Sequence, residues 1–174
     1  NMVDSMIIDG LWDPYNDQHM GNCAELCARE RTFSRKEQDD FAIESFKRAQ
    51  DAWKTGKFKG EIAPVSIVGK KGDTVIVDTD EGPGKVSFDR IPTLKPAFDK
   101  TGTVTAANAS TINDGAAALV LASGDSVKTK GLKPLARIVS YAGHAQEPAW
   151  FTTAPAEAMR KALANAGWSL EQVD

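Results

Sequence analysis

Cysteine and long apolar runs are scarce in this chain of 174 residues. Its two cysteines, Cys23 and Cys27, are too few for a structural zinc site of their own, and their i, i+4 spacing suits one helix face rather than a disulfide. We therefore predict buried free thiols in a reducing compartment. The longest apolar run, 116–122, is too short to span a bilayer, which excludes a membrane-spanning role.

A continuous basic face is also missing, because lysine and arginine are scattered among acidic residues and the net charge is −3. We expect no nucleic-acid partner, although a local basic spot could hold one phosphate. The chain starts at Asn1 without a signal or transit pattern, and it stops at Asp174, after a helix and where a strand would be expected next. Both ends look cut from something longer.

Capping boxes predict two helices near the N-terminus. Asn22 to Glu25 and Ser34 to Glu37 each combine a capping side chain with a glutamate three residues later. The second helix should end near Gly56. Its apolar stripe consists of Phe41, Phe46, Ala49 and Trp53.

Beyond the second helix, the apolar pattern changes to that of strands. Residues 62–68 and 75–77 flank a Gly-containing turn, which predicts a hairpin. Residues 80–96 should form an ordered surface loop, because apolar side chains anchor it: Val86, Phe88, Ile91 and Leu94. Residues 101–115 are almost wholly small or polar, which permits close approach of the backbone to a ligand.

The C-terminal part of the chain has an α/β pattern. We predict strands over 116–122 and 135–141, a helix over 125–130, and a final helix from Pro155 to Gly167. The residues before this tail form a different, mixed unit inserted ahead of it.

Several motifs, taken in order, make the whole chain resemble the biosynthetic thiolases. The most specific is the block from Gly102 to Ala118. The others are Asp9 to Leu11, His19 to Gly21 with Ala24 and Glu25, Glu37 to Asp39 with Phe41 and Ala42, Phe98 to Lys100, and Pro155 to Gly167. The resemblance implies a thiolase-like α/β fold, in which two α/β halves pack together and an inserted loop domain covers the substrate.

By this resemblance the chain has three parts. Residues 1–112 are a mixed α+β loop domain that binds coenzyme A (CoA), residues 113–132 are the last strand and helix of the N-terminal half, and residues 133–174 begin the C-terminal half. The longer parent protein is expected to be a homodimer or homotetramer.

The activity implied is that of an acetyl-CoA C-acetyltransferase, an acyltransferase that reversibly condenses two acetyl-CoA molecules into acetoacetyl-CoA and CoA. This Claisen reaction belongs to lipid metabolism and the mevalonate pathway. The family's nucleophilic cysteine lies upstream of this segment, and its Asn-Glu-Ala-Phe motif, its Gly-His-Pro histidine and its second cysteine lie downstream. None of the four occurs here, so we expect no catalytic residue in this segment and no activity from it alone.

Substrate-binding residues are carried over from the resemblance one by one. His19 and Met20 resemble the pair that lines the acyl end of the pocket in short-chain members, although a lone histidine that caps or packs under a loop is the plainer alternative. Ser110 matches the serine that binds pantetheine, beside a narrow passage. The passage is lined by Ala106, Ala107 and Ala109.

The nucleotide end of CoA is matched by a cationic stretch that would otherwise be an ordinary solvated loop: Lys85, Val86, Ser87 and Arg90. Apolar walls are expected from Leu11, Phe98 and Phe151. The amides of Asn108 and Asn113 would on their own be expected to bond their backbone in turns, and the specificity of the surrounding block favours a ligand role instead.

Phe46 is a departure that bears on potassium. Some mitochondrial members have a tyrosine there and bind K⁺ with it and with three carbonyls equivalent to those of Ala106, Ala107 and Ala109. Phe46 keeps the ring and loses the oxygen, which weakens the case for potassium and leaves a weak carbonyl site.

Two alternatives remain for the function. The chain could be a short, non-catalytic CoA-binding module, or part of a degradative 3-ketoacyl-CoA thiolase, against which the pair His19 and Met20 argues. We expect a cytoplasmic location, with the mitochondrial matrix as the alternative.

Overall fold

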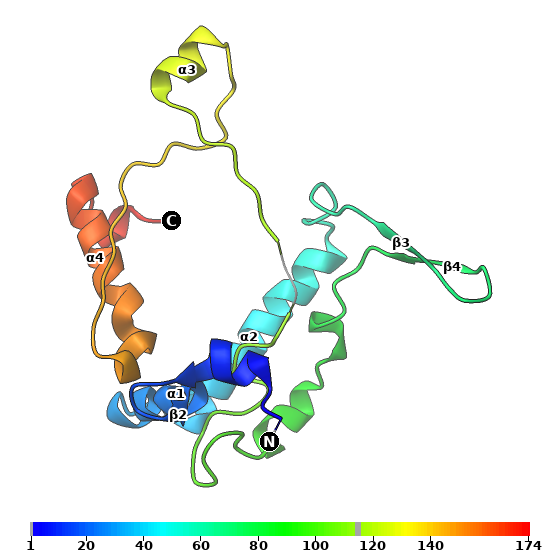
Figure 1. Ribbon diagram of the computed structural model, residues 1–174, viewed down its shortest axis with the longest axis vertical. Helices are drawn as coiled ribbons and strands as arrows, with labels where there is room; N and C mark the ends of the chain where they lie inside the picture. The colour runs from blue at the N-terminus through cyan, green and yellow to red at the C-terminus, as the bar shows by residue number, and fades with distance from the viewer. Residues whose placement is uncertain (1, 114–115) are drawn as a thin grey trace. The chain divides into compact units, whose positions relative to one another are not determined.

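A computed structural model of the chain describes residues 2–113 and 116–174 (Figure 1). Asn1, Asp114 and Gly115 lie outside the described residues, so the central part of the predicted Asn113 to Ala118 motif has no structural account. The chain divides into two compact units, one made of Asn1–Cys27 with Thr111–Asp174 and the other of Ala28–Ser110. Each unit is described by itself.

The first unit opens with a π-helical turn, η1 (Met6–Leu11), and a short antiparallel hairpin of β1 (Trp12–Asp13) and β2 (Gln18–His19). The buried carboxylate of Asp13 builds the turn of this hairpin. Its Oδ1 accepts the backbone N–H groups of Tyr15 and Asn16 at 3.0 and 3.3 Å, and its Oδ2 accepts the Asn16 amide at 2.7 Å.

Helix α1 (Met20–Glu30) follows β2 directly and begins three residues earlier than the Asn22 capping box predicts. The prediction that Asn22 caps this helix is wrong, because His19 caps it instead. The Gly21 N–H donates to Nδ1 of His19 at 2.9 Å, so the helix begins at Met20 and Asn22 lies inside it.

The cysteines lie on α1. Both are free thiols, as predicted. Cys23 is fully buried, whereas Cys27 is only half-buried, so the expectation that both are buried is correct for Cys23 alone.

The rest of the first unit contains helices and no strand among its described residues. Helix α3 (Gly124–Thr129) and helix α4 (Ala154–Ala166) confirm the predicted helices. Pro155 lies in the first turn of α4, which ends at Gly167 with φ +70°. Two 3₁₀ segments, η4 (Pro148–Thr153) and η5 (Leu170–Gln172), flank α4.

The strands predicted over 116–122 and 135–141 are not formed. A strand needs a neighbouring strand to pair its N–H and C=O groups, and the described residues place none beside either segment. Their apolar side chains are left outside, with Leu119 89%, Val120 96% and Leu135 102% exposed.

The second unit is organised around helix α2 (Arg35–Lys54), which has the predicted capping box. The Glu37 N–H donates to Oγ of Ser34, and a Glu37 carboxylate oxygen accepts the Ser34 N–H at 2.8 Å. At the other end, Gly56 with φ +71° donates to the carbonyl of Trp53, and Lys57 donates to that of Ala52, which together form a Schellman C-cap.

The predicted apolar stripe of α2 is only partly correct. Phe46, Ala49 and Trp53 are half-buried, whereas Phe41 is 79% exposed and its neighbour Ala42 is buried instead. No helix of the described residues is long and apolar enough to cross a membrane.

Strands β3 (Val65–Val68) and β4 (Thr74–Val77) form the predicted antiparallel hairpin, with Val65 opposite Val77. Gly72 in the turn has φ +82°, a conformation that favours glycine. All eight strand residues are exposed, six of them valine or isoleucine, and a two-stranded hairpin is only marginally stable by itself.

The segments η2 (Pro83–Lys85) and η3 (Phe88–Thr93) pack against α2 (Figure 1). The Gln50 amide donates to the carbonyl of Pro83 at 2.7 Å, and the Lys47 ammonium lies 5.9 Å from the centre of the Phe88 ring. Ile91 is 1% exposed, so the predicted ordered loop over 80–96 is confirmed.

Candidate functional site

His19 and Met20 lie at the junction of β2 and α1, and both are half-buried. Because Nδ1 of His19 accepts the Gly21 N–H, the neutral ring carries its proton on Nε2. A ring in this state presents an N–H donor at Nε2, which suits hydrogen bonding to a carbonyl oxygen. The plainer alternative for His19, a helix cap, is therefore shown.

Cys23 supports the same junction from inside. Its thiol lies 3.9 Å from Oδ2 of Asp13, and the Gln18 amide donates to its sulfur at 3.4 Å. Burial raises the pKa of the Cys23 thiol, and the neighbouring Asp13 carboxylate raises it further. The Asn16 side-chain hydrogen bond lowers the pKa of Asp13, so that carboxylate stays charged. Cys23 is thus held as a protonated thiol, which is a poor nucleophile.

The remaining predicted residues of the first unit are Leu11, half-buried at the end of η1, and Phe151, 38% exposed on η4. The Gln146 amide fixes the turn that carries Phe151. It donates to the carbonyl of Trp150 and, at 2.7 Å, to Oγ1 of Thr153. This turn gives Phe151 a defined backbone position and leaves its ring partly open.

The predicted nucleotide-end residues lie together on η2, on η3 and in the two residues between them. Lys85, Ser87 and Arg90 are exposed and Val86 is half-buried. Nζ of Lys85 lies 2.6 Å from Oε2 of Glu81. This pair is largely exposed and therefore weak, so a phosphate group can compete for the lysine. Phe46 lies half-buried on α2 in the same unit.

The predicted pantetheine passage is a compact turn over residues 103–110. Ala106 and Ser110 are exposed, whereas Phe98, Ala107 and Ala109 are half-buried. The hydroxyl of Thr105, fully buried, accepts the backbone N–H groups of Ala107 and Asn108 at 3.3 and 3.4 Å. The turn thus presents small side chains outward from a fixed backbone.

The ligand role favoured for Asn108 is wrong. Its two amide protons go to Oδ1 of Asp39 at 3.0 Å and to the carbonyl of Thr103 at 3.1 Å, and its Oδ1 accepts the Thr105 N–H at 2.7 Å. No donor is left for a ligand. The amide of Asn113 likewise bonds locally, to Oγ1 of Thr111 at 2.6 Å.

Sequence reasoning missed the partner of Asn108. Asp39 is buried, and Nε of Arg35 lies 2.7 Å from its Oδ2. The i, i+4 spacing of Arg35 and Asp39 on a predicted helix was a signal for this ion pair. The link to Asn108, 69 positions away, had no local signal.

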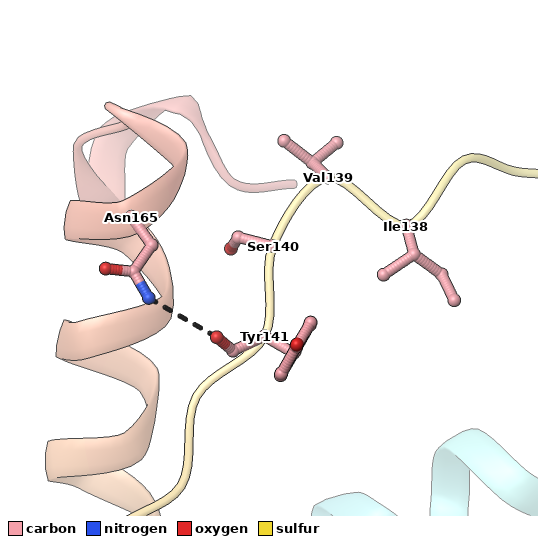
Figure 2. A pocket seen from close by; sticks show the side chains of 5 residues that line it. All are labelled: Ile138, Val139, Ser140, Tyr141 and Asn165. Atoms are coloured by element: carbon pink, nitrogen blue, oxygen red, sulfur yellow. Dashed lines mark hydrogen bonds between the residues drawn. The ribbon is translucent and has the colours of Figure 1, made fainter.

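None of the predicted residues lines the open pocket beside α4 (Figure 2). Its lining consists of Ile138, Val139, Ser140, Tyr141 and Asn165. Figure 2 shows the side chains of Ile138 and Val139 on opposite sides of the chain trace, which is the alternation of an extended segment. The Asn165 amide donates to the Tyr141 carbonyl at 3.3 Å, and Oγ of Ser140 donates to the Ala162 carbonyl at 2.6 Å, so residues 138–141 dock on α4.

The described residues hold no cluster of three or more His, Cys, Asp and Glu side chains that could bind a metal ion. Phe46 offers a ring and no oxygen. The side chain at this position therefore does not fit a potassium ligand.

Two family comparisons cover almost the whole chain. Residues 1–125 match the thiolase N-terminal domain, and residues 132–174 match the thiolase C-terminal domain. The chain belongs to the thiolase family. The resemblance first noted in the Gly102 to Ala118 block is thereby confirmed.

Similar proteins agree with this assignment. The thiolase chain is 52% identical to acetyl-CoA acetyltransferase 2 of Arabidopsis thaliana over 176 residues, which cover 100% of this chain and 44% of the plant protein. It is 55% identical over 176 residues to a mitochondrial acetyl-CoA acetyltransferase of Aspergillus fumigatus, covering 99% of this chain and 40% of the relative.

A solved structure of an Ascaris suum thiolase in complex with coenzyme A matches with a TM-score of 0.90 and 45% identity, over 98% of this chain and 44% of that one. The thiolase-like α/β fold is therefore shown. The chain spans less than half the length of these relatives.

Proposed function

We propose that this chain is the CoA-binding part of an acetyl-CoA C-acetyltransferase. The observation that carries the proposal is the TM-score of 0.90, over 98% of the chain, with a thiolase whose structure contains coenzyme A. The named relatives, both acetyl-CoA acetyltransferases at 52% and 55% identity, support the same activity. Acetyl-CoA, acetoacetyl-CoA and CoA are the proposed ligands.

Each predicted residue has a proposed place along CoA. The cations of Lys85 and Arg90 pair with the nucleotide phosphates, with Val86 and Ser87 beside them. Ser110 hydrogen-bonds pantetheine, next to Ala106. The apolar contacts come from Leu11, Phe46, Phe98 and Phe151.

His19 and Met20 are proposed to contact the acyl group. The Nε2–H of His19 donates to an acyl carbonyl, and Met20 fills the space that a longer acyl chain would need. This pair supports short acyl groups over the long 3-ketoacyl chains of degradative thiolases.

The condensation step is proposed to use residues that this segment does not contain. Acyl transfer needs a thiolate nucleophile, a proton acceptor and an oxyanion site converging on one carbon. Cys23 is held protonated by burial and by Asp13, which does not suit it to that role. We expect no thiolysis of acetoacetyl-CoA by the 174-residue chain alone, and measurable loss of the absorbance of its magnesium complex would sink this part of the proposal.

Calorimetric titration of CoA tests the binding proposal directly. We expect Ser110→Ala and Arg90→Ala to weaken CoA binding by about tenfold each, since each removes one polar contact. Arg48→Ala is the matched control, because Arg48 is an exposed α2 arginine that pairs with Glu44 at 2.7 Å. Equal CoA affinities of wild type, Ser110→Ala and Arg90→Ala would reject the assignment.

The wider setting is also a proposal. We take residues 1–112 as the CoA-binding loop domain, 113–132 as the end of the N-terminal half and 133–174 as the start of the C-terminal half. The whole protein is proposed to be a homodimer or homotetramer that acts in lipid metabolism and the mevalonate pathway, without a tight potassium site.

The compartment is proposed to be the cytosol. The mitochondrial matrix is the alternative, supported by the name of the Aspergillus relative. Subcellular fractionation followed by immunodetection of the protein decides between the two.

A further inference from the structure

The buried carboxylate of Asp39 is held from two sides. Asp39 is 4% exposed, and burial of a charge is costly unless it is paired and hydrogen-bonded. Nε of Arg35 lies 2.7 Å from Oδ2, and Nδ2 of Asn108 donates to Oδ1 at 3.0 Å. Each oxygen of Asp39 therefore has its own donor.

The Asn108 amide carries this anchor into the 103–110 turn. Its second proton goes to the Thr103 carbonyl at 3.1 Å, and its oxygen accepts the Thr105 N–H at 2.7 Å. From the same end of α2, the Gln38 amide donates to Oγ1 of Thr103 at 2.9 Å. The backbone of the turn is therefore fixed by the first turn of the helix.

Arg35 extends the anchor to a second segment. Its Nη2 donates to the carbonyls of Ile91 and Leu94 at 2.9 and 3.0 Å, at the end of η3. A planar guanidinium can serve a carboxylate and two carbonyls at once, because its donors are arranged in a fixed fork. The start of α2 thus holds two of the segments that carry predicted CoA contacts in this unit, the 103–110 turn and η3.

We propose that Asp39 and Asn108 are positioning residues for the pantetheine arm of CoA. They hold the 103–110 turn in the conformation that presents Ala106 and Ser110, and neither residue has a donor to offer the ligand itself. Binding to a preformed turn costs less conformational entropy than binding to a mobile one. The inference rests on the proposed CoA binding and names the residues that position Ser110.

The test compares two ligands in the whole protein that carries this sequence. Asn108→Ala removes the link between Asp39 and the turn. We expect its dissociation constant for CoA to rise by about tenfold, because the turn must be ordered on binding. Adenosine 3′,5′-bisphosphate, which contains the adenosine, the 3′-phosphate and the first 5′-phosphate of CoA and no pantetheine, should bind Asn108→Ala and wild type with the same affinity.

A second variant and a control act on α2. Asp39→Asn presents one acceptor to the two donors from Arg35 and Asn108, so we expect it also to weaken CoA binding. Asp40→Asn is the control, since Asp40 pairs with Lys36 at 2.6 Å in the same i, i+4 geometry but on the exposed face. Asp40→Asn should leave CoA binding unchanged.

The outcomes separate the inference from the proposed function. If wild type does not bind CoA, the proposed function fails, and this inference fails with it. If wild type binds CoA and Asn108→Ala binds it within about twofold of wild type, the positioning role is overturned while the proposed function stands. Equal weakening of both ligands by Asn108→Ala would show a merely structural role and would also overturn it.

Discussion

The imidazole of His19 accepts a hydrogen bond from the backbone N–H of Gly21, with 2.9 Å between Nδ1 and the amide nitrogen. One side chain thus caps α1 and stands at the predicted acyl end of the site. The two roles use different ring nitrogens, because the cap takes Nδ1 and leaves the proton on Nε2. Substitution can therefore separate them.

His19→Asn should keep the cap and lose the ring. Asparagine is a favoured N-cap, so we expect a free energy of unfolding within about 0.5 kcal/mol of wild type, whereas His19→Ala should lower it by about 1 kcal/mol. Both should raise the KM for acetoacetyl-CoA in the whole protein. Urea denaturation and steady-state kinetics measure the two effects, and equal stability of the two variants would contradict the cap.

Cys23 should make the protein less stable in alkaline solution. Its pKa is raised in the folded state, mainly by burial and then by Asp13, above the ordinary 9.0 of a thiol. Its contribution is complete below 9.0 and is lost as the pH rises through the folded pKa. Urea titrations across this range should show a shallower decline for Cys23→Ala than for wild type, and equal slopes would contradict the raised pKa of Cys23.

Arg35→Lys should be more damaging than its conservative appearance suggests. An ammonium cannot reach Asp39 and the carbonyls of Ile91 and Leu94 together, and an unpaired buried acceptor costs about 1–3 kcal/mol. Arg48→Lys, on the exposed pair with Glu44, should cost less than about 0.5 kcal/mol. Thermal and urea unfolding compare the variants, and a similar cost at both sites would argue against the Arg35 anchor.

The ionised carboxylate of Glu37 should stabilise the fold at neutral pH and lose this effect in acid. The Ser34 hydroxyl and backbone N–H lower its pKa from 4.5, so its contribution is present above 4.5 and is lost as the pH falls through the folded value. Glu37→Gln keeps a capping-box residue that does not titrate. Its stability should therefore change less with pH in this window, and parallel wild-type and Glu37→Gln curves would contradict the assignment.

The 174-residue chain should self-associate when it is made alone. Leu119, Val120 and Leu135 are each at least 89% exposed, and contiguous exposed apolar segments favour association. Light scattering after size-exclusion chromatography should give a mass above 18.7 kDa. Val120→Lys with Leu135→Lys should lower that mass, and the control Ala145→Lys, which adds a single lysine at another exposed position, should not.

Local signals were sufficient for part of the fold. The capping box from Ser34 to Glu37 and Gly56 correctly predict where α2 begins and ends, because capping depends on residues within one turn of the helix end. The same signal at Asn22 failed because a histidine, which is not a common cap, had already taken the position. The prediction that Phe41 belongs to the apolar stripe is wrong, because the neighbouring Ala42 faces the interior instead.

Contacts between residues far apart in the chain could not be predicted from the sequence. The predicted strands at 116–122 and 135–141 rest on the apolar pattern of the sequence alone. A strand also requires a partner strand, which that pattern does not reveal. The Asn108 amide could be placed in a turn from its neighbours, but its bond to Asp39 joins positions 69 apart. The motif from Glu37 to Asp39 was recognised as typical of the family without a physical reason, which the ion pair of Asp39 with Arg35 now supplies.

The first turn of α2 also constrains how the family can diverge. Arg35 and Asp39 neutralise one another, and Asp39 needs the amide of Asn108, so loss of any one leaves a charge or a donor stranded in the interior. A substitution at one of these three positions alone should therefore be destabilising. Across descendants of a common ancestor, residues 35, 39 and 108 should be inherited or exchanged as a set, while the exposed pair at 36 and 40 varies freely.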